Sequence, residues 1–380
     1  MDLPQNFNDQ LYAPETSKKP EHRPGKSPSY AHQRCAPAGA PDFMLAAKRA
    51  KQVRHMPPMR YSPGDRLNVM IFDSEELSGD YAVNLDGTVN LPYAGAINAA
   101  GLTNSQLSHR IARALTKKGL FTAEASQISV QPVQYSAVNV TVVGAVFNPG
   151  RVTINAVREK ERFDARKSKS GDNPLERRVP AALMAVGGVR PDADLSKVKV
   201  YRQGKVHTLD WRGAFSGLPV DDMPLIEGDH IEIPEAGCFQ SALVRPSQIT
   251  PGAVRLFISN LTQPGLNNAN SVTNQDTSGG VPYGTRLLQA LVQANCVGGS
   301  YSSNAKRYAV LITRNPKTRK TEVIQRAIED LVRRSDRDTI NPFLMPEDAI
   351  ACYDSSVIEF REVMNTIYGT IAPPIGLSKL

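Results

Sequence analysis

The residues that could carry covalent chemistry are few and scattered. Asp221 and Asp222 could suggest acid–base catalysis, but adjacent residues of a strand face opposite ways, so the pair is typical of a solvated turn. His207 and His230 lie in strand-like contexts, where structural or exposed roles are more common than ligation. The sequence has no GxSxG, HExxH, Walker or dinucleotide-binding glycine motif. It therefore predicts no enzyme, no metal site and no cofactor.

The four cysteines also lack a redox or metal-binding pattern. Cys35, Cys238, Cys296 and Cys352 form no CxxC pair, which argues against a zinc ribbon or a thioredoxin-type centre. The last three fall in one region of the chain, and the spacing leaves open one disulfide or none.

Composition indicates a globular chain of two or three domains. The 380 residues are 41% hydrophobic and 22% charged, which is enough to bury a core. No run reaches the roughly 18 apolar residues of a conventional spanning helix. Residues 1–60 hold ten Lys/Arg and five Asp/Glu, which is +5 of the net charge of +8, and residues 1–59 are predicted to be a basic, Pro-rich N-terminal extension. A solvated tail is favoured over a nucleic-acid-binding surface.

Residues 60–136 have the pattern of a compact α+β unit. A turn at Gly64 and Asp65 precedes an alternating strand, 67–71. Two more alternating runs flank Asp86 and Gly87, which predicts a hairpin with both turn residues at positive φ. A helix is expected from Thr103, where Gln106 completes a capping box.

The following residues contain an internal repeat. A strand and a Pro-Gly turn, Pro149-Gly150, recur as Pro264-Gly265, 115 residues later. A short helix closed by Gly187 and Gly188 also recurs, as do two strands, so duplicated domains are expected at 137–236 and, with a linker, at 237–354. The Pro-Gly turn predicts a positive φ at Gly150, which valine rarely adopts. The Gly150→Val substitution is therefore expected to cause misfolding of the first repeat. Polar insertions at 158–178 and 267–280 are expected to be surface loops.

The C-terminal segment 355–380 is predicted to contain an amphipathic helix. Its apolar side is a stripe at helical spacing: Val357, Phe360, Met364, Ile367 and Ile371. The opposite side is polar: Glu359, Glu362, Asn365 and Thr366. This pattern is compatible both with a helix that packs on its own domain and with a helix that inserts into lipid.

These motifs together resemble the outer-membrane polysaccharide export family, the Wza-type proteins. The stretch 61–69, the Asp86-Gly87 turn and the stretch 95–103 resemble its polysaccharide-export domain. The two repeats resemble its SLBB (soluble-ligand-binding β-grasp) domains. The resemblance covers about residues 60–371 and implies an α+β chain: a small export domain, two β-grasp-like SLBB domains and a C-terminal membrane helix.

The resemblance also implies a function. It indicates a non-enzymatic homo-oligomeric ring, typically octameric, that passes capsular or exopolysaccharide across the outer membrane, with most of the chain in the periplasm. An inner-membrane copolymerase, often a tyrosine autokinase, would be a partner, and nucleic acid would not. The apolar helix stripe would face outer-membrane lipid and the polar side the lumen. The alternatives are a soluble periplasmic polysaccharide-binding adaptor that works with a separate pore, and a polysaccharide-modifying enzyme.

Overall fold

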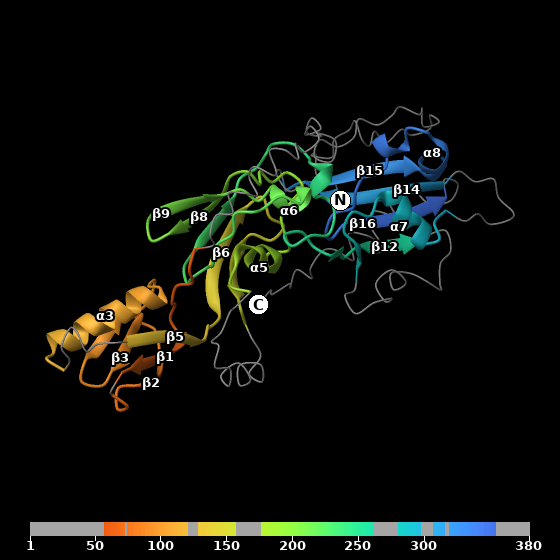
Figure 1. Cartoon of the computed structure of the whole chain (residues 1–380). Helices are drawn as coiled ribbons and strands as arrows, with labels where there is room; N and C mark the ends of the chain where they lie inside the picture. Colours follow the sequence, from red (N-terminus) through yellow and green to blue (C-terminus); the bar gives the residue numbers. More distant parts are fainter. Residues whose placement is uncertain are drawn as a thin grey trace, which may run out of the picture. The chain divides into compact units, whose positions relative to one another are not determined.

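The structure is a computed structural model, which describes residues 57–72, 74–120, 128–156, 176–260, 280–297, 307–315 and 319–354. The described chain forms two compact units (Figure 1). One holds the residues up to 237 together with 247–250, and the other holds 238–246 and the residues from 251 on. Both combine small sheets with helices, so the expected α+β class is confirmed.

The first unit begins with a helix packed on a three-stranded sheet (Figure 1). The sheet has the order β2-β1-β5, from β1 (Arg66–Ile71), β2 (Gly79–Ala82) and β5 (Ile128–Gln134). Alternate residues of β1 are buried in the same core as Leu107, Ile111 and Leu115 of helix α3 (Asn104–Lys117). A separate two-stranded sheet pairs β3 (Thr88–Leu91) with β4 (Gly95–Asn98).

The boundaries of α3 agree with the sequence prediction. The Thr103 hydroxyl accepts a hydrogen bond from the Gln106 N–H at 3.3 Å, and the Gln106 side chain accepts one from the Thr103 N–H at 3.1 Å. These two bonds are the predicted capping box, which satisfies two donors that a helix leaves open. Past the last turn, Gly119 has φ +73°, the left-handed conformation that commonly ends a helix.

The turn at Asp86 and Gly87 differs from the predicted hairpin. Only Gly87 has a positive φ, at +81°, and the strands on either side pair elsewhere, β2 with β1 and β3 with β4. The Asp86 carboxylate accepts hydrogen bonds from the Thr88 N–H at 2.9 Å and from its hydroxyl at 2.7 Å. Asp86 is absent from the residues with positive φ, and β2 and β3, on either side of the turn, belong to different sheets.

The rest of the first unit is built on a five-stranded sheet of order β7-β6-β10-β8-β9. Its strands are β6 (Val138–Gly144), β7 (Gly150–Ile154), β8 (Val198–Arg202), β9 (Lys205–Leu209) and β10 (His230–Ile233). β10 pairs with β6 in parallel and with β8 antiparallel. The helices are α5 (Val179–Ala185) and α6 (Gly213–Ser216).

The second unit is built on a four-stranded sheet of order β12-β16-β14-β15. Its strands are β12 (Phe257–Asn260), β14 (Arg307–Arg314), β15 (Thr321–Ala327) and β16 (Ala349–Asp354). The helices are α7 (Leu287–Gln293) and α8 (Ile328–Arg333). Short elements complete it: η1 (Ser241–Leu243), η2 (Arg337–Thr339) and the pair β11 (Ala253–Val254) with β13 (Val281–Pro282).

The two large sheets share one strand arrangement. In each, the last strand pairs in parallel with the first and antiparallel with a middle strand, which continues into an antiparallel hairpin. A short helix lies between the first and middle strands in both, as α5 and α7. This arrangement agrees with the duplication that the sequence predicts, while the boundaries at 136, 236 and 354 stay predictions.

Gly150 does not adopt the positive φ that the sequence predicts. It is the first residue of β7, it is absent from the residues with positive φ, and a Cβ placed on it meets nothing within 4 Å. The Pro149-Gly150 turn therefore does not require glycine, and the expected misfolding of Gly150→Val loses its basis. Gly187 and Gly188, in contrast, have φ values of +80° and +88° just after α5.

Several predicted features lie outside the described residues. They are most of the N-terminal extension, Pro264 and Gly265, and both sides of the C-terminal helix from Val357 to Ile371. Among the helices that the structure describes, none has the length and apolar composition needed to cross a membrane.

Candidate functional site: three aspartate turns and a buried arginine

One type of aspartate turn occurs three times in the described chain. The turns span 62–65, 226–229 and 345–348, and each precedes a strand. In each, the aspartate carboxylate accepts a hydrogen bond from the backbone N–H of the first residue, at 2.7, 2.9 and 2.8 Å. The third residue has φ of +87°, +83° and +67°. Because its side chain closes the turn, each aspartate has a structural role.

Each turn also forms two backbone hydrogen bonds with a neighbouring stretch of chain. The N–H of the third residue donates to the carbonyls of Val83, Asn139 and Arg255, at 2.8, 3.0 and 2.9 Å. The aspartate carbonyl accepts from the N–H of Val83, Thr141 and Phe257, at 2.8, 2.9 and 2.9 Å. The turns at Asp229 and Asp348 thus bond to residues two apart on a parallel strand, whereas the turn at Asp65 exchanges both bonds with Val83, as antiparallel neighbours do.

The charged partner of the aspartate differs among the turns. All three carboxylates are buried, with Asp65, Asp229 and Asp348 at most 2% exposed. Asp65 pairs with Arg177 at 2.9 Å, and Asp229 pairs with Arg202 at 2.5 Å. In the second unit, the position equivalent to Arg202 is occupied by Thr313. The strand registers give this equivalence: Tyr201 pairs with His230 in the first unit, and Ile312 pairs with Ala349 in the second.

Asp348 is therefore held by neutral hydrogen bonds. Its carboxylate accepts from the Met345 N–H at 2.8 Å and from the Thr313 hydroxyl. Burial raises the pKa of Asp348 to about 7, while these two bonds act in the opposite direction. A carboxyl without a neighbouring cation in a buried place favours its protonated form.

Arg177 joins two parts of the first unit. Its guanidinium is fully buried and donates to both oxygens of Asp65, at 2.9 and 3.0 Å, and to the Ser62 hydroxyl at 2.7 Å. Its Nε donates to the Leu225 carbonyl at 3.2 Å, and the group lies 5.1 Å from the centre of the Tyr135 ring. One side chain thus binds three stretches that are distant in the sequence.

The Asp65 carboxylate also accepts hydrogen bonds from Ser136. Its Oδ1 accepts from the N–H and the hydroxyl of Ser136, at 2.7 and 2.8 Å. Burial raises the pKa of Asp65, while Arg177 and the N–H groups of Ser136 and Ser62 lower it. Since Ser136 lies between β5 and β6, the cluster fastens the helix-bearing part to the five-stranded sheet.

The sequence did not predict the two arginine partners, Arg177 and Arg202. Arg177 belongs to the insertion 158–178 that was expected to be a surface loop, yet its side chain is 0% exposed. The available signal was the recurrence of a Gly-Asp or Glu-Asp step before the strands at 66, 230 and 349. That recurrence identifies the aspartates, but it does not identify a partner that lies 112 residues away.

The candidate acid–base residues do not form a catalytic arrangement. Asp221 accepts from the Asp210 N–H at 3.2 Å, while Asp222 accepts from the Met223 N–H at 2.8 Å and lies 3.9 Å from Arg178. Burial raises the pKa of Asp222. Within the described residues, no group of three or more His, Cys, Asp or Glu could hold a metal ion.

A polar cluster lies on one face of the five-stranded sheet. Glu232 accepts from the Tyr201 hydroxyl at 2.6 Å and from Lys199 at 3.3 Å, and His230 lies edge-on to the Tyr201 ring at 5.8 Å. The Tyr201 hydroxyl holds the pKa of Glu232 below its usual range. An ionised carboxylate suits this cluster to hydrogen bonding rather than to proton donation. His207 lies in the exposed part of β9.

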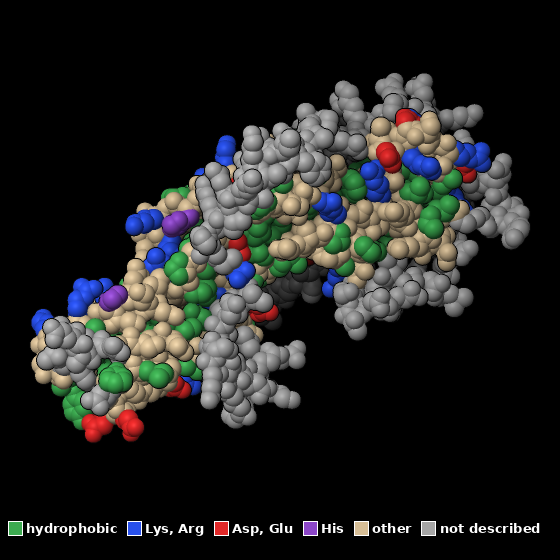
Figure 2. Space-filling view, in the orientation of Figure 1, with side chains coloured by type: hydrophobic (Ala, Val, Ile, Leu, Met, Phe, Trp, Pro, Cys, Tyr) green, Lys and Arg blue, Asp and Glu red, His purple; other side chains and the backbone are tan. Residues whose placement is uncertain are grey.

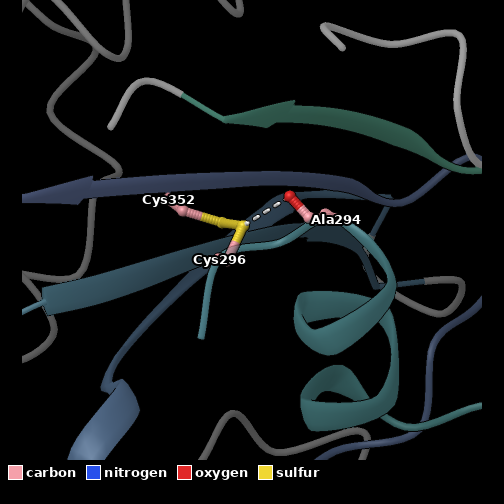
Figure 3. Close-up of a disulfide and its surroundings, with 3 residues drawn as sticks. All are labelled: Ala294, Cys296 and Cys352. Atoms are coloured by element: carbon pink, nitrogen blue, oxygen red, sulfur yellow. Dashed lines mark hydrogen bonds between the residues drawn. A yellow bond between two sulfur atoms is a disulfide. The ribbon is translucent and has the colours of Figure 1, made fainter. Parts of the chain in front are cut away.

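One disulfide joins the segment just after α7 to β16 (Figure 3). Cys296 and Cys352 are both buried, their Cα atoms are 6.0 Å apart, and they enclose a sequence separation of 56. This pair resolves the alternatives that the spacing left open. Disulfides persist in oxidising compartments such as the periplasm, so the bond fits a chain that works outside the cytoplasm.

Comparison with known proteins agrees with the export-domain assignment. Residues 54–131 match the family described as "Polysaccharide biosynthesis/export protein". The chain is 26% identical over 209 residues to the EPS I polysaccharide export outer membrane protein EpsA of Ralstonia nicotianae (strain ATCC BAA-1114 / GMI1000), covering 53% of this chain and 49% of that protein. It is 25% identical to the protein of the same name from Ralstonia solanacearum, covering 53% and 50%.

These matches confirm the resemblance to the outer-membrane polysaccharide export family. The family is one of export proteins rather than of enzymes. The chain spans about half the length of the curated relatives that it matches. The SLBB character of the two repeats stays a prediction.

Proposed function

We propose that this chain is a non-enzymatic subunit of an oligomeric ring that exports capsular or exopolysaccharide across the outer membrane. The observation that carries the proposal is the match of residues 54–131 to the polysaccharide export family, together with relatives named as polysaccharide export outer membrane proteins. Export requires no bond making, and the described residues offer hydrogen-bonding surfaces rather than a catalytic arrangement.

The proposed assembly is a homo-oligomer, octameric as the family resemblance implies. Most of the chain would lie in the periplasm, and the C-terminal helix would meet outer-membrane lipid. An inner-membrane copolymerase with tyrosine autokinase activity would supply the polymer. The buried joint at Asp65 and Arg177 supports such a role, because a hydrated conduit needs subunits whose parts keep a fixed geometry.

A complementation experiment tests the export role. Cells that lack this chain receive either the full chain or a chain cut after Asp354, and polymer is quantified outside the cell and in the periplasm. The proposal expects the full chain to restore extracellular polymer and the cut chain to leave it in the periplasm. Restoration by the cut chain, without membrane association, would favour the adaptor alternative. Turnover of purified polymer by the protein would instead favour an enzyme.

A further inference from the structure

Charges are segregated along the export domain. Residues 67–109 contain five Asp/Glu and no Lys/Arg, whereas residues 110–118 contain four Lys/Arg and no Asp/Glu. Figure 2 shows the result at one end of the first unit, where Lys and Arg side chains gather along one edge and acidic side chains lie at another. The export domain therefore presents two surfaces of opposite charge.

The basic surface is the outer face of α3. Arg110, Arg113 and Lys117 are exposed and follow the spacing i, i+3 and i+7, which aligns them along the helix. They lie apart from the buried Leu107, Ile111 and Leu115. The helix contains no acidic residue of its own to neutralise them. This face, defined by Arg110, Arg113 and Lys117, is called the basic face.

The acidic surface is the turn at 74–77, which follows β1. Glu75 and Glu76 are exposed, and the turn is anchored because Leu77 is 5% exposed. The Ser78 hydroxyl accepts from the Ile71 N–H at 2.9 Å and donates to the Ser74 carbonyl at 2.6 Å. These bonds hold the two carboxylates in a fixed place, and the turn at 74–77 is called the acidic turn.

Exposed apolar side chains lie beside the acidic turn. Phe72 is 71% exposed and Met70 is 57% exposed. Together with Glu75 they line an open groove of about 820 Å³ that also reaches His109 and Ala112 of α3. Apolar residues rimmed by charge are typical of a protein contact, because burial supplies affinity while the charges select the partner.

We propose that the basic face of one copy docks onto the acidic turn of the next copy, in a head-to-tail contact between export domains. Two different, complementary surfaces on the same chain make a heterologous interface, and such interfaces close into rings when the rotation allows. Like charges would oppose a two-fold arrangement in which the same surface meets itself. This inference rests on the proposed ring and names the surfaces that form it.

A charge-swap experiment on the full-length protein tests this contact. One variant carries Arg110→Glu and Arg113→Glu, which makes the basic face acidic. A second carries Glu75→Lys and Glu76→Lys, which makes the acidic turn basic. The control carries Lys197→Glu and Lys205→Glu, an equal change of charge at exposed positions elsewhere in the first unit. The mass of each detergent-extracted protein is measured by light scattering, and folding is checked by circular dichroism.

The expected result is specific to a head-to-tail contact. Each swapped variant alone should fall to the 41.4 kDa monomer, while the wild type and the control keep the mass of the ring. An equal mixture of the two swapped variants should assemble again, because each acidic surface then meets a basic one in alternating order. Raised salt should weaken the wild-type assembly, because salt screens charges at the surface.

Two results would overturn the inference, and they are distinguishable from a failure of the proposed function. If the swapped variants keep the mass of the wild-type ring, or if their mixture stays monomeric, the proposed contact is wrong, but the proposed ring is not contradicted. If the wild-type chain is itself monomeric under the same conditions, both the proposed ring and the proposed contact are wrong.

Discussion

Arg177 and Asp65, 112 residues apart in the sequence, form a fully buried ion pair in which one guanidinium nitrogen contacts both carboxylate oxygens. The same arginine donates to the Ser62 hydroxyl and the Leu225 carbonyl. Ser136, between two strands that belong to different sheets, donates to the same carboxylate. The pair therefore fixes how the export domain is attached to the sheet that follows it.

Replacing Arg177 by methionine should strongly destabilise the first unit. The change leaves Asp65 buried without its cation, and breaking a buried pair in this way costs about 3–5 kcal/mol. Urea unfolding followed by circular dichroism measures the loss. The neighbouring Arg178→Met is the matched control, because Arg178 is 28% exposed and lies 3.9 Å from Asp222, so its removal should cost about 0–1 kcal/mol. Equal effects of the two changes would contradict the assigned role.

Asp348→Asn and Asp229→Asn should have opposite effects at neutral pH, although both remove a charge from the same kind of turn. Asp348 has a folded-state pKa of about 7 against an ordinary value of 3.8, so the folded state holds its proton more tightly than the unfolded state. Its contribution to stability is greatest below pH 4 and is lost as the pH rises to about 7. Asp348→Asn should therefore stabilise the protein by a few kcal/mol above pH 7 and flatten the slope between pH 4 and 7.

Asp229→Asn supplies the contrast. It leaves Arg202, whose side chain is 10% exposed, without its carboxylate, so stability at neutral pH should fall by about 3–5 kcal/mol. Melting temperatures of the wild type and both variants, recorded from pH 4 to pH 8, compare the two turns. A fall in stability for Asp348→Asn at pH 8 would show that the carboxylate is ionised and well held there.

The fold was predictable where local patterns determine structure, and less so where distant residues meet. Thr103 and Gln106 signal their helix because both capping bonds lie within four residues. The hairpin prediction at Asp86 was wrong because the sequence of a turn does not determine which strands pair on either side of it. Arg177 could not be assigned, since its sequence neighbours are charged and polar while its partner lies 112 residues away. Cys296 and Cys352 were candidates for a bond, but only the fold chooses the pair.

Gly144→Ala should destabilise the first unit far more than Gly150→Ala. Gly144 has φ +92°, and a Cβ on it would lie 2.0 Å from the Ile233 carbonyl oxygen, where β6 runs beside β10. Backbone cannot move aside as a flexible side chain can, so a loss of several kcal/mol is expected. Gly150 has open space at its Cβ and should change stability by less than about 1 kcal/mol. Denaturant midpoints of the two variants measure the difference, and a tolerated Gly144→Ala would contradict the close strand contact.

Reduction of the Cys296–Cys352 bond should weaken the second unit. A bond across a separation of 56 residues restricts the unfolded chain and typically contributes about 2–4 kcal/mol. Thermal unfolding with and without a reductant measures this contribution. The variant with both cysteines changed to alanine is the control: Cys238 is also disulfide-bonded, so any shift that reductant still causes in this variant arises outside the Cys296–Cys352 bond. An equal shift in that variant would place the sensitivity at another site.

Ile367→Asp should prevent membrane association if the C-terminal stripe faces lipid, as the sequence predicts. A carboxylate on the lipid-facing side of a spanning helix costs about 2–4 kcal/mol near the centre of the bilayer. Asn365→Asp is the matched control, because it adds the same charge on the predicted lumen side. Partitioning of the full chain into liposomes distinguishes the two orientations. Loss of binding in Ile367→Asp alone supports the lipid-facing stripe, whereas normal binding of Ile367→Asp contradicts it.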